Sequence, residues 1–99
     1  MPVRSDDVAT DAGTLHAAGA SLHWTVVAST LVCDAFEGDP AAFTSLADAA
    51  NALAVERFLA LLVTRVRSGD PHLPALRAAG FVDDGEAVDG EFTLVRHVR

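Results

Sequence analysis

The sequence predicts a mainly helical α+β domain, with three or four helices followed by a C-terminal β-hairpin. Three observations lead to this fold class. Apolar residues recur every three to four positions through much of the chain, which is the spacing of a helix face. Gly-Asp-Pro occurs at 38–40 and again at 69–71, where it can end one element and begin the next. Two β-favourable runs flank a Gly- and Asp-rich loop within residues 81–98.

The first helix is expected over residues 14–36. Leu15, Leu22 and Val26 follow helical spacing along one stripe. Trp24 lies off this stripe, so the helix is apolar on more than one face. A helix that is apolar nearly all round is buried in a core or between subunits. We therefore expect this segment to pack against a second copy of the chain or against another protein.

The segment 41–67 is expected to form two helices with a break near residues 51–54. A single helix would place Leu46 and Leu53 on the face that carries Arg57, and a break removes this conflict. The two apolar stripes are then Phe43, Leu46, Ala47 and Ala50 in the first helix, and Val55, Phe58, Leu59, Leu62 and Val66 in the second.

The rest of the chain is expected to hold a short helix and a hairpin. The short helix covers about residues 71–79, and Gly80 follows it at the position that prefers left-handed backbone geometry. Residues 81–82 and 91–98 are the expected strands, joined by an acidic loop.

Size and composition limit the classes of protein. Ninety-nine residues hold one domain, which we expect at 11–99 after a flexible N-terminal tail at 1–10. A hydrophobic fraction of 51% excludes a wholly disordered chain, and a net charge of −7 opposes binding to nucleic acid and to anionic membranes. The lone Cys33 excludes an intramolecular disulfide. With no secretory signal and no apolar span of about 20 residues, a cytoplasmic location is expected.

The middle of the chain resembles a helix-turn-helix. The matching positions are Leu46-Ala47, Ala50, Leu53-Ala54-Val55, Phe58, Leu61 and Leu62. The similarity covers about residues 40–98 and is to winged helix-turn-helix-like domains, with the hairpin at 81–98 as the wing. Ala54 stands where Gly is usual, and the extra segment 70–79 departs from the simplest pattern.

This resemblance implies two functions. In a DNA-binding member, Arg57, Thr64, Arg65 and Arg67 would contact bases or phosphates. The expected wing at 83–91, however, holds five acids and no base, so phosphates would repel it. Similar apolar winged modules serve as dimerisation domains in front of small-molecule O-methyltransferases. We therefore expect a non-catalytic protein-interaction or dimerisation domain with a regulatory or assembly role, and a winged-helix DNA-binding transcription regulator is the first alternative.

A second alternative is a small-molecule-binding protein or small enzyme with a pocket near His16, His23 and Trp24. The two histidines are seven residues apart, which is about 10 Å along a helix. That separation is too large for one metal ion, so no metal is expected. No cofactor is expected either, because the sequence has no Gly-rich phosphate loop, paired CxxC or nucleophile elbow.

Two features near residue 35 carry chemistry. Cys33 is expected in the core, because burial and nearby acids raise the pKa of a thiol and suppress its reactive form. Asp34 and Glu37 would lie one helical turn apart, as an acid/base pair or, with Asp39, as the solvated end of a helix. An enzyme is therefore less expected than a binding protein. The expected partner is a second copy of the chain or another protein, with neither nucleic acid nor membrane.

Overall fold

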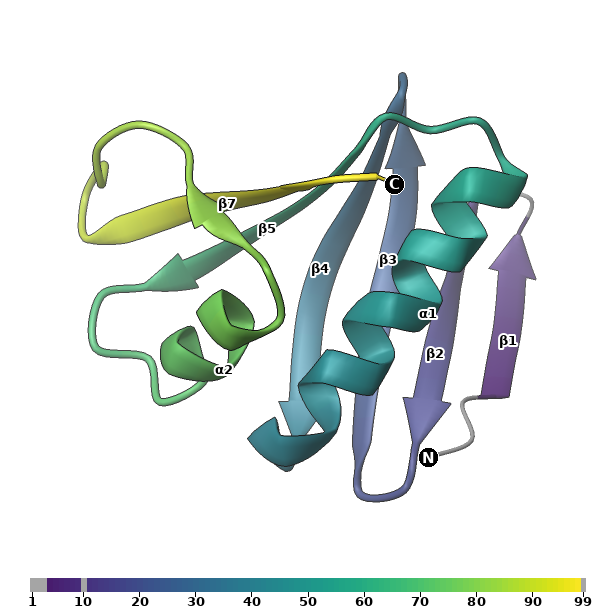
Figure 1. Cartoon of the computed structure of the whole chain (residues 1–99), viewed down its shortest axis with the longest axis horizontal. Coiled ribbons are helices and arrows are strands. Elements are labelled where there is room, and N and C mark those ends of the chain that lie inside the picture. The colour runs from purple at the N-terminus through teal and green to yellow at the C-terminus, as the bar shows by residue number, and fades with distance from the viewer. Residues whose placement is uncertain (1–3, 10, 99) are drawn as a thin grey trace.

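The computed structural model describes residues 4–9 and 11–98, and within them seven strands form one mixed sheet in the order β1-β2-β3-β4-β5-β7-β6 (Figure 1). The strands are β1 (Arg4–Ala9), β2 (Ala12–Ala17), β3 (Ala20–Val27), β4 (Thr30–Gly38), β5 (Leu61–Arg67), β6 (Val82–Asp83) and β7 (Glu91–His97). The helices are α1 (Phe43–Glu56) and α2 (Leu73–Ala78), with a 3-10 turn, η1 (Pro40–Ala42), before α1. The mainly helical fold class expected from the sequence is therefore wrong.

The expected first helix is instead three antiparallel strands, β2, β3 and β4. Leu22 and Trp24 are buried, whereas the intervening His23 and Thr25 are only partly covered, which is the two-residue period of a strand. The β-branched residues between 25 and 32 favour this structure over a helix. Gly19, with φ of +78°, lies in the turn between β2 and β3.

The expected second helix of the helix-turn-helix is also wrong. Helix α1 runs through the expected break at 51–54 and ends at Glu56. The chain then turns at Phe58, whose φ is +59°, and continues as strand β5. Leu62, Thr64 and Val66 face the core in alternation, so the apolar residues of this segment belong to a strand. A winged helix is excluded by this topology.

The C-terminal part follows the expectation more closely. Helix α2 falls within the expected range, and Gly80 after it has φ of +97°. The amide of Phe81 donates to the carbonyl of Leu76 at 3.1 Å, which closes the helix end. Strands β6 and β7 pair as the expected hairpin. The expected tail at 1–10 lies partly outside the described residues, at 1–3 and 10, and its residues 4–9 form β1.

The core lies between one face of the sheet and the two helices. Helix α1 crosses β2, β3 and β4 (Figure 1), and its buried face is rich in alanine, so the helix can approach the sheet closely. Leu46 is completely buried there, and its replacement by alanine would cost about 2–5 kcal/mol. No described helix covers the opposite face, which we call the open face. Neither α1 nor α2 is long and apolar enough to span a membrane.

Candidate active site

The two parallel strands of the sheet separate part of the way along their length. Strands β4 and β5 are paired only from Thr30↔Leu61 to Cys33↔Thr64, although β4 continues to Gly38 and β5 to Arg67. Figure 1 shows the two strands diverging beyond this point. At the last pair, the buried Thr64 hydroxyl donates to the Cys33 carbonyl at 3.1 Å. Open α/β sheets bind ligands at the carboxyl ends of their parallel strands, so this β4–β5 opening is the candidate site.

A β-bulge lies at the closed end of the opening. On β3, Trp24 pairs with Cys33 and His23 pairs with Ala35, which leaves Asp34 without a partner residue across the ladder. Asp34 is exposed, and Thr25 Oγ1 donates to its Oδ2 at 2.5 Å. Bulges next to active sites re-aim a side chain, and this one fixes a carboxylate beside the opening.

The carboxylate lines a cavity on the open face of the sheet. This open-face cavity has a volume of about 340 Å³. Its lining residues are Val27, Val32, Cys33, Asp34, Val63 and Arg65. The walls are therefore largely aliphatic, with one carboxylate and one guanidinium as the charged groups.

A second cavity lies on the other side of the opening, towards α2. This helix-side cavity has a volume of about 170 Å³. Its lining residues are Phe36, Thr64, Arg65, Val66, Asp70, His72 and Leu76. The Nδ1 atom of His72 lies 3.0 Å from Asp70 Oδ1, and the His72 ring stacks on Phe43 with 5.0 Å between centroids. These contacts fix the imidazole and leave its Nε2 without a partner among the described residues.

Cys33 is not the reactive group of this site. Burial, and secondarily the charge of Asp34, raises the pKa of its thiol to about 12. The nucleophilic thiolate is therefore suppressed at neutral pH. The expectation that Cys33 is a core residue is confirmed, since its side chain is 1% exposed.

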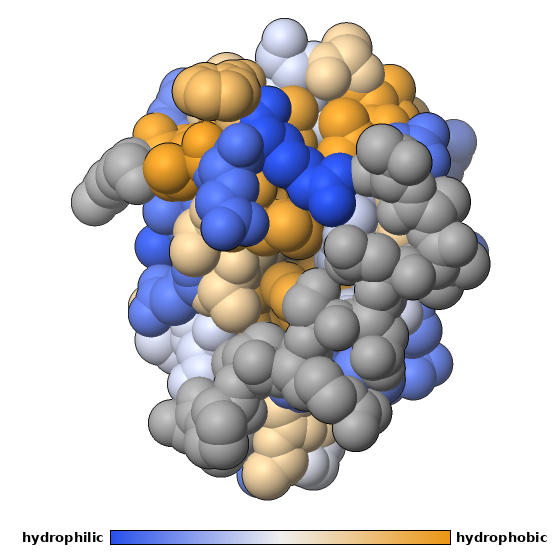
Figure 2. All heavy atoms as spheres, turned by 90° about the vertical axis from the view of Figure 1, so that its right-hand side faces the viewer, coloured by the Kyte–Doolittle hydropathy of each residue, from blue (hydrophilic) through white to orange (hydrophobic). Residues whose placement is uncertain are grey.

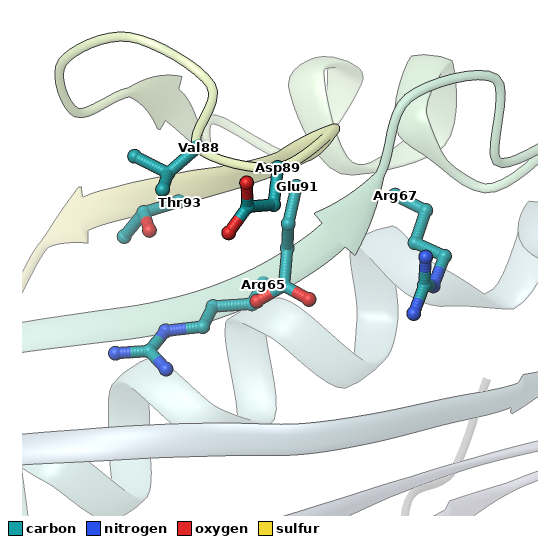
Figure 3. A pocket seen from close by; sticks show the side chains of 6 residues that line it. All are labelled: Arg65, Arg67, Val88, Asp89, Glu91 and Thr93. Atoms are coloured by element: carbon teal, nitrogen blue, oxygen red, sulfur yellow. The ribbon is translucent and has the colours of Figure 1, made fainter.

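A third cavity, of about 430 Å³, lies between β5, β7 and the loop before β7 (Figure 3). Its lining residues are Arg65, Arg67, Val88, Asp89, Glu91 and Thr93. Because Arg65 lines both this cavity and the open-face cavity, the two are neighbours on the open face.

Of the three residues expected to form a small-molecule pocket, the structure places Trp24 on the opposite face of the sheet from His16 and His23. Trp24 is 1% exposed in the core, with the Arg57 guanidinium 4.8 Å from its ring centroid. His16 and His23 lie on the open face, where His23 Nδ1 is 2.9 Å from Thr14 Oγ1. Within the described residues, no group of three or more His, Cys, Asp or Glu side chains is placed to hold a metal ion.

Of the four residues expected to contact DNA, only Arg65 and Arg67 lie together. Arg57 follows α1, Thr64 is 2% exposed, and Arg65 and Arg67 lie on the open face of β5. The site residues that helical spacing missed are Thr25 and His72. The strand alternation of 20–27 was the signal for Thr25, and Asp70, two residues before His72, was the signal for a fixed imidazole.

No protein-family model and no curated protein matches the sequence. Solved structures do match. Nourseothricin acetyltransferase has a TM-score of 0.73 at 20% identity, over 91% of this chain and 67% of that one. The ribosomal-protein-S18-alanine N-acetyltransferase from Escherichia coli has a TM-score of 0.69 at 14% identity, over 91% and 71%. The PaiA N-acetyltransferase from Thermoplasma acidophilum, in complex with coenzyme A, has a TM-score of 0.75 at 11% identity, over 88% and 61%.

These likenesses correct the sequence-based function. The proteins that share the fold are acetyltransferases, which are enzymes. The winged-helix assignment, the non-catalytic interaction or dimerisation role, the DNA-binding alternative and the expectation against an enzyme are therefore all wrong. At these identities the likeness shows the fold, and the chain has the fold of the GNAT-family acetyltransferases.

Proposed function

We propose that this chain transfers an acyl group from a thioester of the coenzyme A type to a primary amine. The observation that carries this proposal is the β4–β5 opening, which has the Asp34 carboxylate on one side and the His72 imidazole on the other. The fold is that of N-acetyltransferases, and two of the matching structures contain coenzyme A.

The opening fits the thioester arm of coenzyme A. Residues 34–38 of β4 and 65–67 of β5 have no strand partner on the edges that face each other, because the parallel ladder stops at Cys33 and Thr64. An extended chain that carries amide groups can add to such edges as a peptide strand does. The helix-side cavity, of about 170 Å³, has apolar walls at Phe36 and Leu76, which suits the thioester end of the arm.

The start of α1 does not fit the phosphates of coenzyme A. Helix N-termini bind phosphate through free backbone N–H groups. Here the Asp39 carboxylate already accepts from the Ala41 amide at 3.0 Å, and Pro40 has no N–H to offer. A phosphate at this position would meet a carboxylate. The residues present therefore hold the thioester arm rather than the phosphates.

Bound in the opening, the thioester supplies an activated acyl carbonyl. A primary amine arrives at neutral pH mainly as the ammonium ion, and Asp34 attracts this cation in the open-face cavity. The ammonium ion first gives one proton to water, which leaves the neutral amine as the nucleophile. As the C–N bond forms and the C–S bond breaks, Asp34 takes a second proton from the nitrogen. The Thr25 hydroxyl holds the carboxylate in place for this step.

The leaving sulfur takes a proton on the other side of the opening. His72 lines the helix-side cavity and gives this proton from Nε2 as the imidazolium, because Asp70 accepts from Nδ1; solvent then restores the proton. Cys33 is buried and stays a thiol, so no acyl-cysteine forms at this residue.

The test is acyl transfer by the full chain. The protein is mixed with acetyl-CoA and a panel of primary amines, and the released thiol and the mass of the acetylated amine are measured. We expect equal molar amounts of thiol and acetylated amine, and a kcat at least about 10-fold lower in His72→Gln. Thiol release at the rate of the protein-free blank with every amine, from protein that is folded by circular dichroism, would exclude the proposal.

A further inference from the structure

Two arginines on the open face have no side-chain partner among the residues that the structure describes. Arg65 and Arg67 are both exposed, and neither makes an ion pair or a hydrogen bond with any described side chain. By contrast, Arg77 pairs with Asp83, and Arg96 pairs with Asp48. Two neighbouring arginines that form no ion pair with the described residues are unusual in a chain whose net charge is −7.

The pair lies where a bound acceptor would lie. Residues i and i+2 of a strand point to the same face, and Figure 3 shows Arg65 and Arg67 on the same side of β5. Arg65 shares the open-face cavity with Asp34 and shares the third cavity with Arg67. Asp89 and Glu91 line that third cavity too, but neither is within ion-pair distance of an arginine there.

We infer that the acceptor amine carries a carboxylate, which Arg65 and Arg67 bind while Asp34 faces the amine. This inference rests on the proposed acyl transfer. Arginine is suited to the role because its planar guanidinium donates two parallel hydrogen bonds to a carboxylate. Val27, Val32 and Val63 supply aliphatic walls beside these charges. The acceptor class that matches this arrangement is an amino acid with an aliphatic side chain.

The phosphates of the acyl donor are the competing anion for these arginines. Arg65 lines both the open-face cavity, together with Asp34, and the helix-side cavity, so Arg67 is the residue that distinguishes the acceptor from the donor. Arg67 lines only the open-face side and is absent from the helix-side cavity that suits the thioester arm.

The experiment compares leucine with leucinamide, which has the same amine and side chain but no carboxylate. We expect the wild-type kcat/KM to be about 10–100-fold higher for leucine, the range for a charge-assisted hydrogen-bonded contact. Arg65→Gln and Arg67→Gln should each reduce this preference severalfold or more. Arg77→Gln is the matched control, because Arg77 is on α2 and paired with Asp83, and it should keep the preference.

Two results would overturn the inference. One is equal kcat/KM for leucine and leucinamide in the wild type. The other is an arginine variant that raises the KM of acetyl-CoA but not that of S-acetyl-N-acetylcysteamine, a donor without phosphates, because the arginines would then bind the donor.

A binding measurement separates this inference from the proposed function. N-acetylleucine and N-acetylleucinamide are titrated into the full chain by calorimetry. If no amine is acetylated but N-acetylleucine binds more tightly than its amide, and Arg65→Gln removes the difference, the arginines bind a carboxylate and it is the proposed function that fails. If amines are acetylated without regard to a carboxylate, the function stands and the inference fails.

Discussion

Phe58 holds a backbone conformation that its side chain does not favour. It follows the C-terminus of α1 with φ of +59°, and its ring is 94% exposed. The amide of Leu59 donates to the Ala54 carbonyl at 2.9 Å, and that of Phe58 to the Val55 carbonyl at 3.2 Å. This is the hydrogen-bond pattern that ends many helices, and glycine is the usual residue at the left-handed position.

Phe58→Gly should therefore stabilise the protein. The left-handed conformation costs a residue with a side chain about 1–2 kcal/mol, and glycine avoids this cost. The greater freedom of glycine in the unfolded chain removes about 0.5–1 kcal/mol of the gain. The exposed ring contributes almost no buried area, so the net expectation is about 0.5–1 kcal/mol of added stability, or about 2–8 °C in Tm.

Urea and thermal unfolding of the two proteins measure this difference, with Phe58→Ala as the matched control. Alanine removes the ring but keeps the strained conformation, so its stability should stay within about 0.5 kcal/mol of wild type. Destabilisation by glycine, or equal stabilisation by alanine and glycine, would refute the reasoning.

Figure 2 shows hydrophobic side chains gathered near one end of the molecule, and Val55 and Phe58 are among the exposed apolar residues at the end of α1.

Three further outcomes follow from the structure. Gly38→Ala should cost about 3 kcal/mol or more in urea unfolding, because φ is +97° and an added Cβ would lie 2.0 Å from the Gly19 carbonyl oxygen. Asp39→Asn, which keeps a capping oxygen but removes the charge, should lower the KM of acetyl-CoA severalfold and leave that of S-acetyl-N-acetylcysteamine unchanged. The Cys33 thiol has a pKa of about 12 in the fold against 9.0 for the free group, so its contribution to stability is complete below pH 9 and is lost as pH rises towards 12. Unfolding free energies from pH 8 to 11 should therefore fall less steeply in Cys33→Ala than in wild type.

The sequence predicts some elements well because their signals are local. The hairpin at the C-terminus and the short helix before it are marked by Asp, Pro and Gly80, whose geometry needs no distant contact. Burial of Cys33 also follows from its apolar neighbours. In these parts of the chain, the turn residues and the local composition both indicate the structure that is observed.

Strands β2, β3 and β5 could not be predicted from local sequence signals in the same way. Leu15 and Leu22 are seven residues apart, which suits a helix, but they face each other across β2 and β3. The end of α1 has no glycine at Phe58, so the apolar residues of β5 read as more of the same helix. In both segments, pairing with distant strands determines the secondary structure and overrides the helical spacing of the apolar residues.

The candidate site depends on pairing that no local pattern shows. A helix would bring Asp34 and Glu37 close together, whereas in β4 the bulge isolates Asp34 and gives it Thr25 as a partner. The separation of β4 and β5 is a relation between strands 31 residues apart at Cys33 and Thr64. The expected homodimer stays a prediction, although the apolar surface around Trp24 that suggested it is buried within one chain.

The kcat of Asp34→Asn tests the central claim most directly. Asparagine keeps an oxygen for the Thr25 hydroxyl but cannot take a proton from the amine. We predict a loss of about 10²–10⁴-fold in kcat for acetyl transfer with the KM of the donor nearly unchanged, while the exposed Asp84→Asn control keeps the wild-type rate. A wild-type kcat in Asp34→Asn would contradict the account.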